Sequence, residues 1–153
     1  FCLSRGLGDV YKRQSAMTAI SFVRSKADKF NIKEDFYKEK DIHIHVPEGA
    51  VPKDGPSAGI TMTTAIVSAL TNRKVNRQFA MTGEVTLRGR VLAIGGLKEK
   101  ILAANRYGIK NIIIPKENEV DIDEIPEEIR ETLKIYTVSD VCEVLDLVLE
   151  KEV

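Results

Sequence analysis

Several features that would point to particular protein classes are missing from this sequence of 153 residues. It has only two cysteines, Cys2 and Cys142, which are too few and too far apart to predict a disulfide framework or a zinc site. The 23 basic and 23 acidic residues cancel, so the composition predicts no nucleic-acid partner. There is no apolar run of about 18 residues and no signal-peptide core, so we predict no membrane contact and a cytoplasmic location.

The length and composition that remain are those of one folded domain. A chain of this size buries roughly 70% of the surface that its unfolded form exposes, and 43% of its residues are hydrophobic. Residues 1–14 show no clear period and do not begin with methionine. We therefore expect a fragment boundary of partly non-native sequence over residues 1–14 and the folded domain over residues 15–153.

Hydrophobic periodicity predicts helices and strands that alternate irregularly. Helices are expected from Ser15 to about Asn31, over 57–70, over 97–107 with Gly108 as a left-handed end, after Pro126, and from a cap at Ser139 to Leu149. Strands are expected over 41–46, 79–87, 91–94, 111–114 and 135–138, with a hairpin turn at 88–90. This order is typical of a single α/β or α+β domain.

Ser57 is the first candidate for chemistry. It stands where a turn rich in glycine and proline, residues 52–59 (Pro-Lys-Asp-Gly-Pro-Ser-Ala-Gly), passes into a helix that is apolar nearly all round. The unpaired N–H groups and the dipole of a helix N-terminus favour negative charge, as in an oxyanion hole. The pattern is consistent with a nucleophilic serine, although most serines at such a position are ordinary N-caps.

A serine nucleophile needs a base, and histidine fits poorly here. Residues 55–59 match the Gly-x-Ser-x-Gly elbow, but that fold places its histidine after the serine. His43 and His45, the only two histidines, both precede Ser57. A triad of one of them with Asp54 and Ser57 would crowd all three roles into one short segment, whereas known triads draw on separated segments. As metal ligands the two histidines lack a third partner, and an alternating strand face explains them as well.

Lysine is the alternative base, provided that burial lowers its pKa. Lys100 is the best placed candidate, because it adjoins the predicted apolar stripe of Leu97, Ile101 and Ala104. Periodicity alone favours the alternative of a surface lysine whose stem lies along that stripe.

Further motifs stand in register with residues 52–59. They are His-Ile-His-Val-Pro-Glu-Gly at 43–49, Met-Thr-Gly-Glu at 81–84, Leu-Arg-Gly at 87–89 and Ile-Gly-Gly-Leu-Lys-Glu-Lys at 94–100. Together these motifs resemble the proteolytic domain of the A-type Lon proteases, from about Ser15 to the last predicted helix.

The resemblance implies a serine endopeptidase with a serine–lysine dyad. By motif, Ser57 is the nucleophile and Lys100 is the base. Thr82 matches a residue whose hydroxyl orients that lysine, and Asp54 matches a position that pairs with the lysine in inactive conformations. The resemblance also implies an α+β fold like the second domain of ribosomal protein S5, a homohexameric ring, and unfolded or damaged polypeptides as substrates.

The sequence departs from the resemblance at two points. No Gly-x-x-x-x-Gly-Lys-[Ser/Thr] motif occurs, so the ATPase module that drives Lon proteolysis, with its ATP and Mg²⁺, is expected to be absent from this chain. Residues 7–10 follow the family's entry to its first helix, but residues 11–14 do not. No metal or organic cofactor is expected in this chain. The alternative function is a noncatalytic S5-like assembly or binding module, since a fold alone does not fix function.

Overall fold

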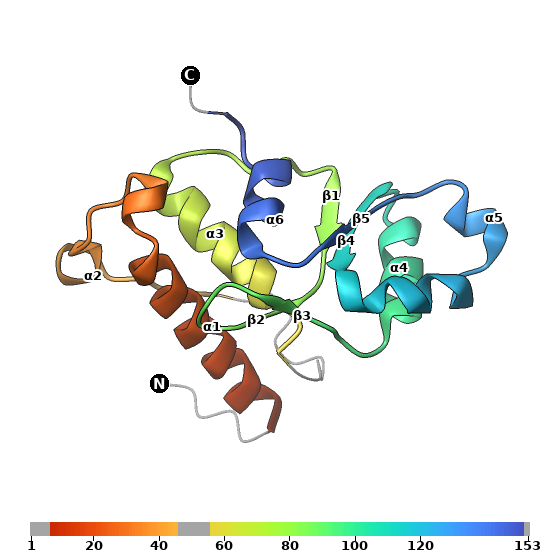
Figure 1. Cartoon of the computed structure of the whole chain (residues 1–153), viewed down its shortest axis with the longest axis horizontal. Coiled ribbons are helices and arrows are strands. Elements are labelled where there is room, and N and C mark those ends of the chain that lie inside the picture. Colours follow the sequence, from red (N-terminus) through yellow and green to blue (C-terminus); the bar gives the residue numbers. More distant parts are fainter. Residues whose placement is uncertain (1–6, 46–55, 152–153) are drawn as a thin grey trace.

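The computed structural model describes residues 7–45 and 56–151, and within these it contains helices and short strands (Figure 1). In chain order they are α1 (Leu7–Ser25), η1 (Asp28–Phe30), α2 (Phe36–Glu39), α3 (Gly59–Thr71), β1 (Phe79–Met81), β2 (Glu84–Val85), β3 (Val91–Leu92), α4 (Leu97–Arg106), β4 (Asn111–Pro115), η2 (Lys116–Glu124), α5 (Glu127–Arg130), β5 (Lys134–Val138) and α6 (Val141–Val148). The chain is a single small α+β domain.

A parallel sheet of three strands, in the order β1-β4-β5, separates the two hydrophobic cores. Side chains of successive strand residues point to opposite faces, and β4 shows this directly. Ile113 joins the core that contains residues of α1, α3 and α6, whereas Ile112 and Ile114 join the core beneath α4. Figure 1 shows α3 and α6 on one side of these strands and α4 on the other. The buried apolar run 111–114 therefore behaves as predicted.

The predicted strand 79–87 is wrong as a single element, although the hairpin that follows it is confirmed. The chain leaves β1 at Thr82, whose N–H still donates to Ile113 O at 3.1 Å, and it starts a second sheet at β2. β2 pairs antiparallel with β3 across a turn that includes Gly89 in the left-handed region, φ 88°. Periodicity cannot separate two short strands that follow one another but belong to different sheets.

The predicted strand 41–46 is also wrong over its described part. Residues 41–45 have no regular secondary structure, and Val46 lies outside the described residues. The side chain of Ile44 is exposed, with a relative accessibility of 36%. Alternation of apolar and polar residues marks a strand only where a neighbouring strand supplies hydrogen bonds, and no described strand pairs with this segment.

The helix ends differ from their predicted positions. α1 begins at Leu7 rather than Ser15 and ends at Ser25. The short helix η1 follows, and its C-cap is Asn31, which is left-handed with φ 53°. α4 is followed by left-handed Gly108, as predicted. The cap of α6 is Asp140 and not Ser139, because the Asp140 carboxylate accepts from Cys142 N and a capping box with Glu143 completes the turn. No helix in the described ranges is long and apolar enough to cross a membrane.

Candidate active site

Ser57 lies in the turn immediately before α3. The N-cap of α3 is Ala58, without a side-chain capping bond, so the interpretation of Ser57 as the helix cap is wrong. Two donors hold the carbonyl oxygen of the preceding Pro56: Gly59 N at 3.1 Å and the hydroxyl of Ser15, from α1, at 3.4 Å. Ser57 is half-buried, and no described residue is hydrogen-bonded to its hydroxyl. Its main chain is thus fixed by neighbours while its side chain has no structural bond to a described group.

The segment after β1 holds Ser57 from the other side. Gly83 N donates to Ser57 O at 2.9 Å, and the Thr82 hydroxyl donates to the same oxygen at 3.4 Å. In return, Ile60 N in the first turn of α3 donates to Gly83 O at 3.1 Å. The structure therefore brings together Ser57 and Thr82, two of the predicted site residues, through the backbone of Gly83.

This approach requires residues without side chains. A Cβ added at Gly59 would stand 2.8 Å from Val85 N, and one added at Gly83 would stand 2.7 Å from Val91 Cγ1. Both distances are shorter than real side chains tolerate, so the two glycines allow α3 to pack directly on the β2–β3 hairpin. Gly83 belongs to the Thr-Gly-Glu motif, so the sequence motifs did point to this residue. No motif pointed to Ser15, whose hydroxyl bonds to Pro56 O.

Lys100 lies in the first turn of α4, which is anchored by the buried side chains of Leu97 and Ile101. Lys100 is half-buried, whereas its neighbours Lys98 and Glu99 are exposed. Burial lowers the pKa of the Lys100 amine from its ordinary value, and no described charged group adds to that effect. A lowered pKa increases the fraction of neutral amine, the form that accepts a proton. The described residues include no hydrogen bond between the Lys100 amine and Ser57 or Thr82.

The helices that carry these residues begin on the same side of the molecule. In Figure 1 both α3 and α4 start at the lower side and run upward, with the sheet between them. Each presents its N-terminus, the end with unpaired N–H groups and partial positive charge, to that side.

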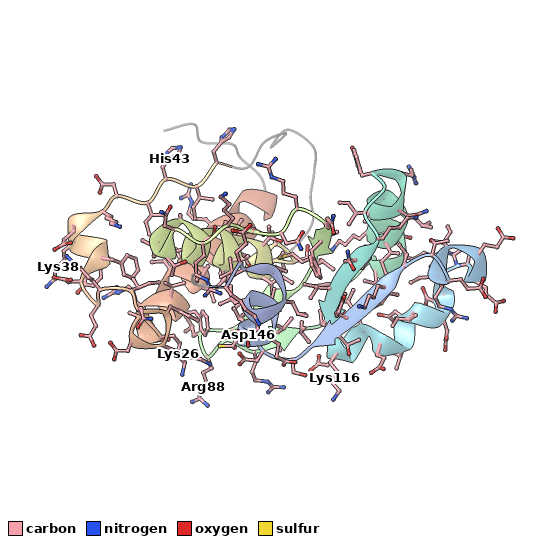
Figure 2. The ribbon with its side chains drawn as sticks, turned by 90° about the horizontal axis from the view of Figure 1, so that it is seen from above. Lys26, Lys38, His43, Arg88, Lys116 and Asp146 are labelled. Carbon is pink, nitrogen blue, oxygen red and sulfur yellow. The ribbon has the colours of Figure 1, made fainter. Side chains whose placement is uncertain are left out.

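The remaining candidates are placed as follows. Asp54 lies outside the described residues. His43 and His45 are both exposed in the irregular segment before that gap, and Figure 2 shows His43 at the outer surface. Within residues 7–45 and 56–151, no group of three or more His, Cys, Asp or Glu side chains is arranged to hold a metal ion.

Comparison with known proteins shows which family this chain belongs to. The family model described as the Lon protease (S16) C-terminal proteolytic domain matches residues 1–151. The chain belongs to this family. It is 65% identical to the Lon protease of Finegoldia magna over 147 residues. These residues make up 96% of the chain and 19% of that relative.

Other Lon proteases match over the same part of the chain. The Lon protease of Clostridioides difficile is 60% identical over 149 residues, which is 97% of the chain and 19% of the relative. Lon protease 1 of Bacillus subtilis is 62% identical over 144 residues, 94% of the chain and 18% of the relative. The chain therefore spans about a fifth of the length of these Lon proteases. The resemblance inferred from the sequence motifs is confirmed.

Proposed function

We propose that this chain is a serine endopeptidase domain in which Ser57 is the nucleophile and Lys100 is the general base. The observation that carries the proposal is the pair of helix starts. Ser57 lies in the turn before α3, where Gly83 N binds its carbonyl oxygen, and α4 carries Lys100, a half-buried lysine of lowered pKa. Membership of a family of proteolytic domains supports peptide bonds as the target.

The chemistry proceeds in two steps. Neutral Lys100 takes the proton of the Ser57 hydroxyl as its oxygen attacks the scissile carbonyl, and the lysine then gives that proton to the leaving amine. Water then attacks the acyl-enzyme and loses its proton to the same lysine, which returns that proton to the Ser57 oxygen as the acyl–oxygen bond breaks. Thr82 orients the lysine in this proposal, and Asp54 pairs with it when the site is inactive.

The N–H groups at the start of α3 differ in whether they already have a hydrogen-bond acceptor. Gly59 N and Ile60 N already donate to Pro56 O and Gly83 O. The described residues provide no acceptor for the N–H groups of Ser57, Ala58 and Thr61. We assign the oxyanion hole to this second group, because a donor must be unengaged to bind the developing charge.

The wider context is part of the same proposal. The substrates are unfolded or damaged polypeptides. In the whole protein they are delivered by a module that depends on ATP and Mg²⁺. The working assembly is a homohexameric ring in the cytoplasm. The fold is related to the second domain of ribosomal protein S5, and the proteolytic domain begins at about Ser15. No metal, cofactor, membrane or nucleic acid takes part in this domain's chemistry.

Cleavage of an unfolded protein substrate by the purified chain tests the proposal. Ser57→Ala and Lys100→Ala should each abolish cleavage, while their unfolding midpoints in urea stay close to that of the wild type. Full cleavage by Lys100→Ala, with loss in His43→Ala, would contradict the dyad and favour the histidine triad. If no variant and no wild-type preparation cleaves, the noncatalytic assembly module becomes the better account.

A further inference from the structure

Asn118 is a buried polar side chain far from the predicted site residues in the sequence. It lies in η2 with a relative accessibility of 3%. Its Oδ1 accepts from Ile94 N at 2.9 Å, and its Nδ2 donates to Ile94 O at 2.9 Å and to Asp121 Oδ2 at 2.6 Å. The side-chain amide thus binds both main-chain polar groups of one residue, as an opposing residue does in an antiparallel pair.

Ile94 is the last residue before the glycine pair that leads into α4. Gly95 is exposed, and a Cβ there would meet no atom within 4 Å, so nothing packs against Gly95 itself. Gly96 is left-handed with φ 67°, and its carbonyl oxygen accepts from Lys100 N at 3.3 Å. The entry to the helix turn that carries Lys100 therefore starts from a residue that Asn118 holds at two atoms.

We propose that Asn118 is a positioning residue that sets the location of Lys100 by fixing the main chain of Ile94. This inference rests on the proposed function, in which Lys100 is the general base. Asn118 itself touches no predicted site residue, and it acts only through the residues 94–96.

The chemistry of the contact requires an amide. A carboxylate at position 118 would have no hydrogen to donate to Ile94 O, and it would place a buried negative charge beside the carboxylate of Asp121, whose Oδ2 lies 2.6 Å from Asn118 Nδ2. A hydroxyl or a methyl would not span the distance to both Ile94 atoms. Removal of the amide leaves the Ile94 N–H and C=O without partners in a partly buried place, so we expect residues 94–96 to move toward water.

The test measures the titration of Lys100 directly. NMR of the lysine side-chain ¹³Cε groups, with the Lys100 signal assigned from Lys100→Met, gives its pKa in the wild-type chain, in Asn118→Ser and in Asp121→Ala. Because burial lowers the pKa of Lys100, a loosened entry should raise that pKa toward the ordinary value. The shift should be smaller in Asp121→Ala, which keeps both bonds to Ile94 and removes the bond that steadies the amide.

Ile125→Val is the matched control. Ile125 is buried in the same core, directly after η2, and it has no bond to Ile94. We expect it to lower stability in urea without moving the Lys100 titration. Faster amide hydrogen exchange at Ile94 should accompany the pKa shift in Asn118→Ser and Asp121→Ala and be absent from the control.

The outcomes separate this inference from the proposed function. An unchanged Lys100 titration in folded Asn118→Ser and Asp121→Ala, or an equal shift in Ile125→Val, would overturn the positioning role. Should Asn118→Ser not fold, Asp121→Ala decides by the same criterion. In the peptidase assay, kcat should fall about 10- to 100-fold in Asn118→Ser with KM little changed. A shifted titration with an inactive wild type would uphold the positioning role while contradicting the peptidase.

Discussion

The N–H of Gly83 donates to the carbonyl oxygen of Ser57 at 2.9 Å, and this bond ties the segment after β1 to the turn before α3. Ile60 N returns a bond to Gly83 O at 3.1 Å. The pair of bonds occupies the N–H of Ile60 and leaves the N–H groups of Ser57, Ala58 and Thr61 for a bound oxyanion. The position of Ser57 is therefore decided by a backbone contact between segments far apart in the chain.

Gly59→Ala should disturb this contact. The added Cβ would stand 2.8 Å from the backbone nitrogen of Val85, which cannot move as a flexible side chain would. We expect a loss of about 1–3 kcal/mol in the free energy of unfolding, measured by urea denaturation, together with loss of peptidase activity.

Gly95→Ala is the control for that substitution, since a Cβ there meets nothing within 4 Å. It should leave stability unchanged or raise it by about 0.4–1 kcal/mol, because alanine restricts the unfolded chain. Equal stability of the two variants would mean that α3 does not need to approach β2 so closely.

Thr82→Val tests the role of the Thr82 hydroxyl, which donates to Ser57 O at 3.4 Å. Valine keeps the shape of threonine, and so long a bond contributes little, so stability should change by less than about 1 kcal/mol. We expect kcat to fall on the order of 10-fold, because Lys100 loses its orienting partner. Thr82→Ser retains the hydroxyl and should stay near wild type; wild-type kcat in Thr82→Val would remove Thr82 from the site.

Much of the fold could be predicted from local patterns in the sequence. The buried strand around Ile112 to Ile114, the stripe of Leu97 and Ile101, and the left-handed end at Gly108 follow from residue type and spacing. The apolar helix after Ser57 is also present as predicted.

Several of the errors share a cause: hydrogen-bond partners decide where an element begins and ends, and hydrophobic periodicity does not show those partners. Thr82 pairs with β4 and Glu84 with β3, so an apparently continuous strand divides between two sheets. Ser139 has the right residue type for a cap, but Asp140 has the extended backbone and the Glu143 partner that complete the box. The contacts of Ser15 and Asn118 join segments distant in sequence, so no local pattern announces them.

Lys100 should make stability depend on pH in a defined direction. Its pKa is lowered in the folded chain, so the charged amine is penalised by folding at any pH below that folded value. The penalty fades as the pH rises through the folded pKa toward the ordinary value of 10.5. Lys100→Met should therefore be more stable than the wild type at neutral pH, with an advantage that shrinks as the pH is raised.

Urea unfolding over that pH range measures the effect, with Lys98→Met as the control. Lys98 is exposed in the same turn of α4, so its substitution should change stability by no more than about 0.5 kcal/mol. If the stability advantage of Lys100→Met over the wild type grew with rising pH, burial would not be the cause of the lowered Lys100 pKa.

Covalent labelling by a fluorophosphonate, with the modified residue located by mass spectrometry, tests the serine–lysine dyad most directly. The account predicts a label on Ser57 in the wild type and in His43→Ala, and loss of that label in Lys100→Met. A label on Ser57 that persists in Lys100→Met and disappears in His43→Ala would contradict it.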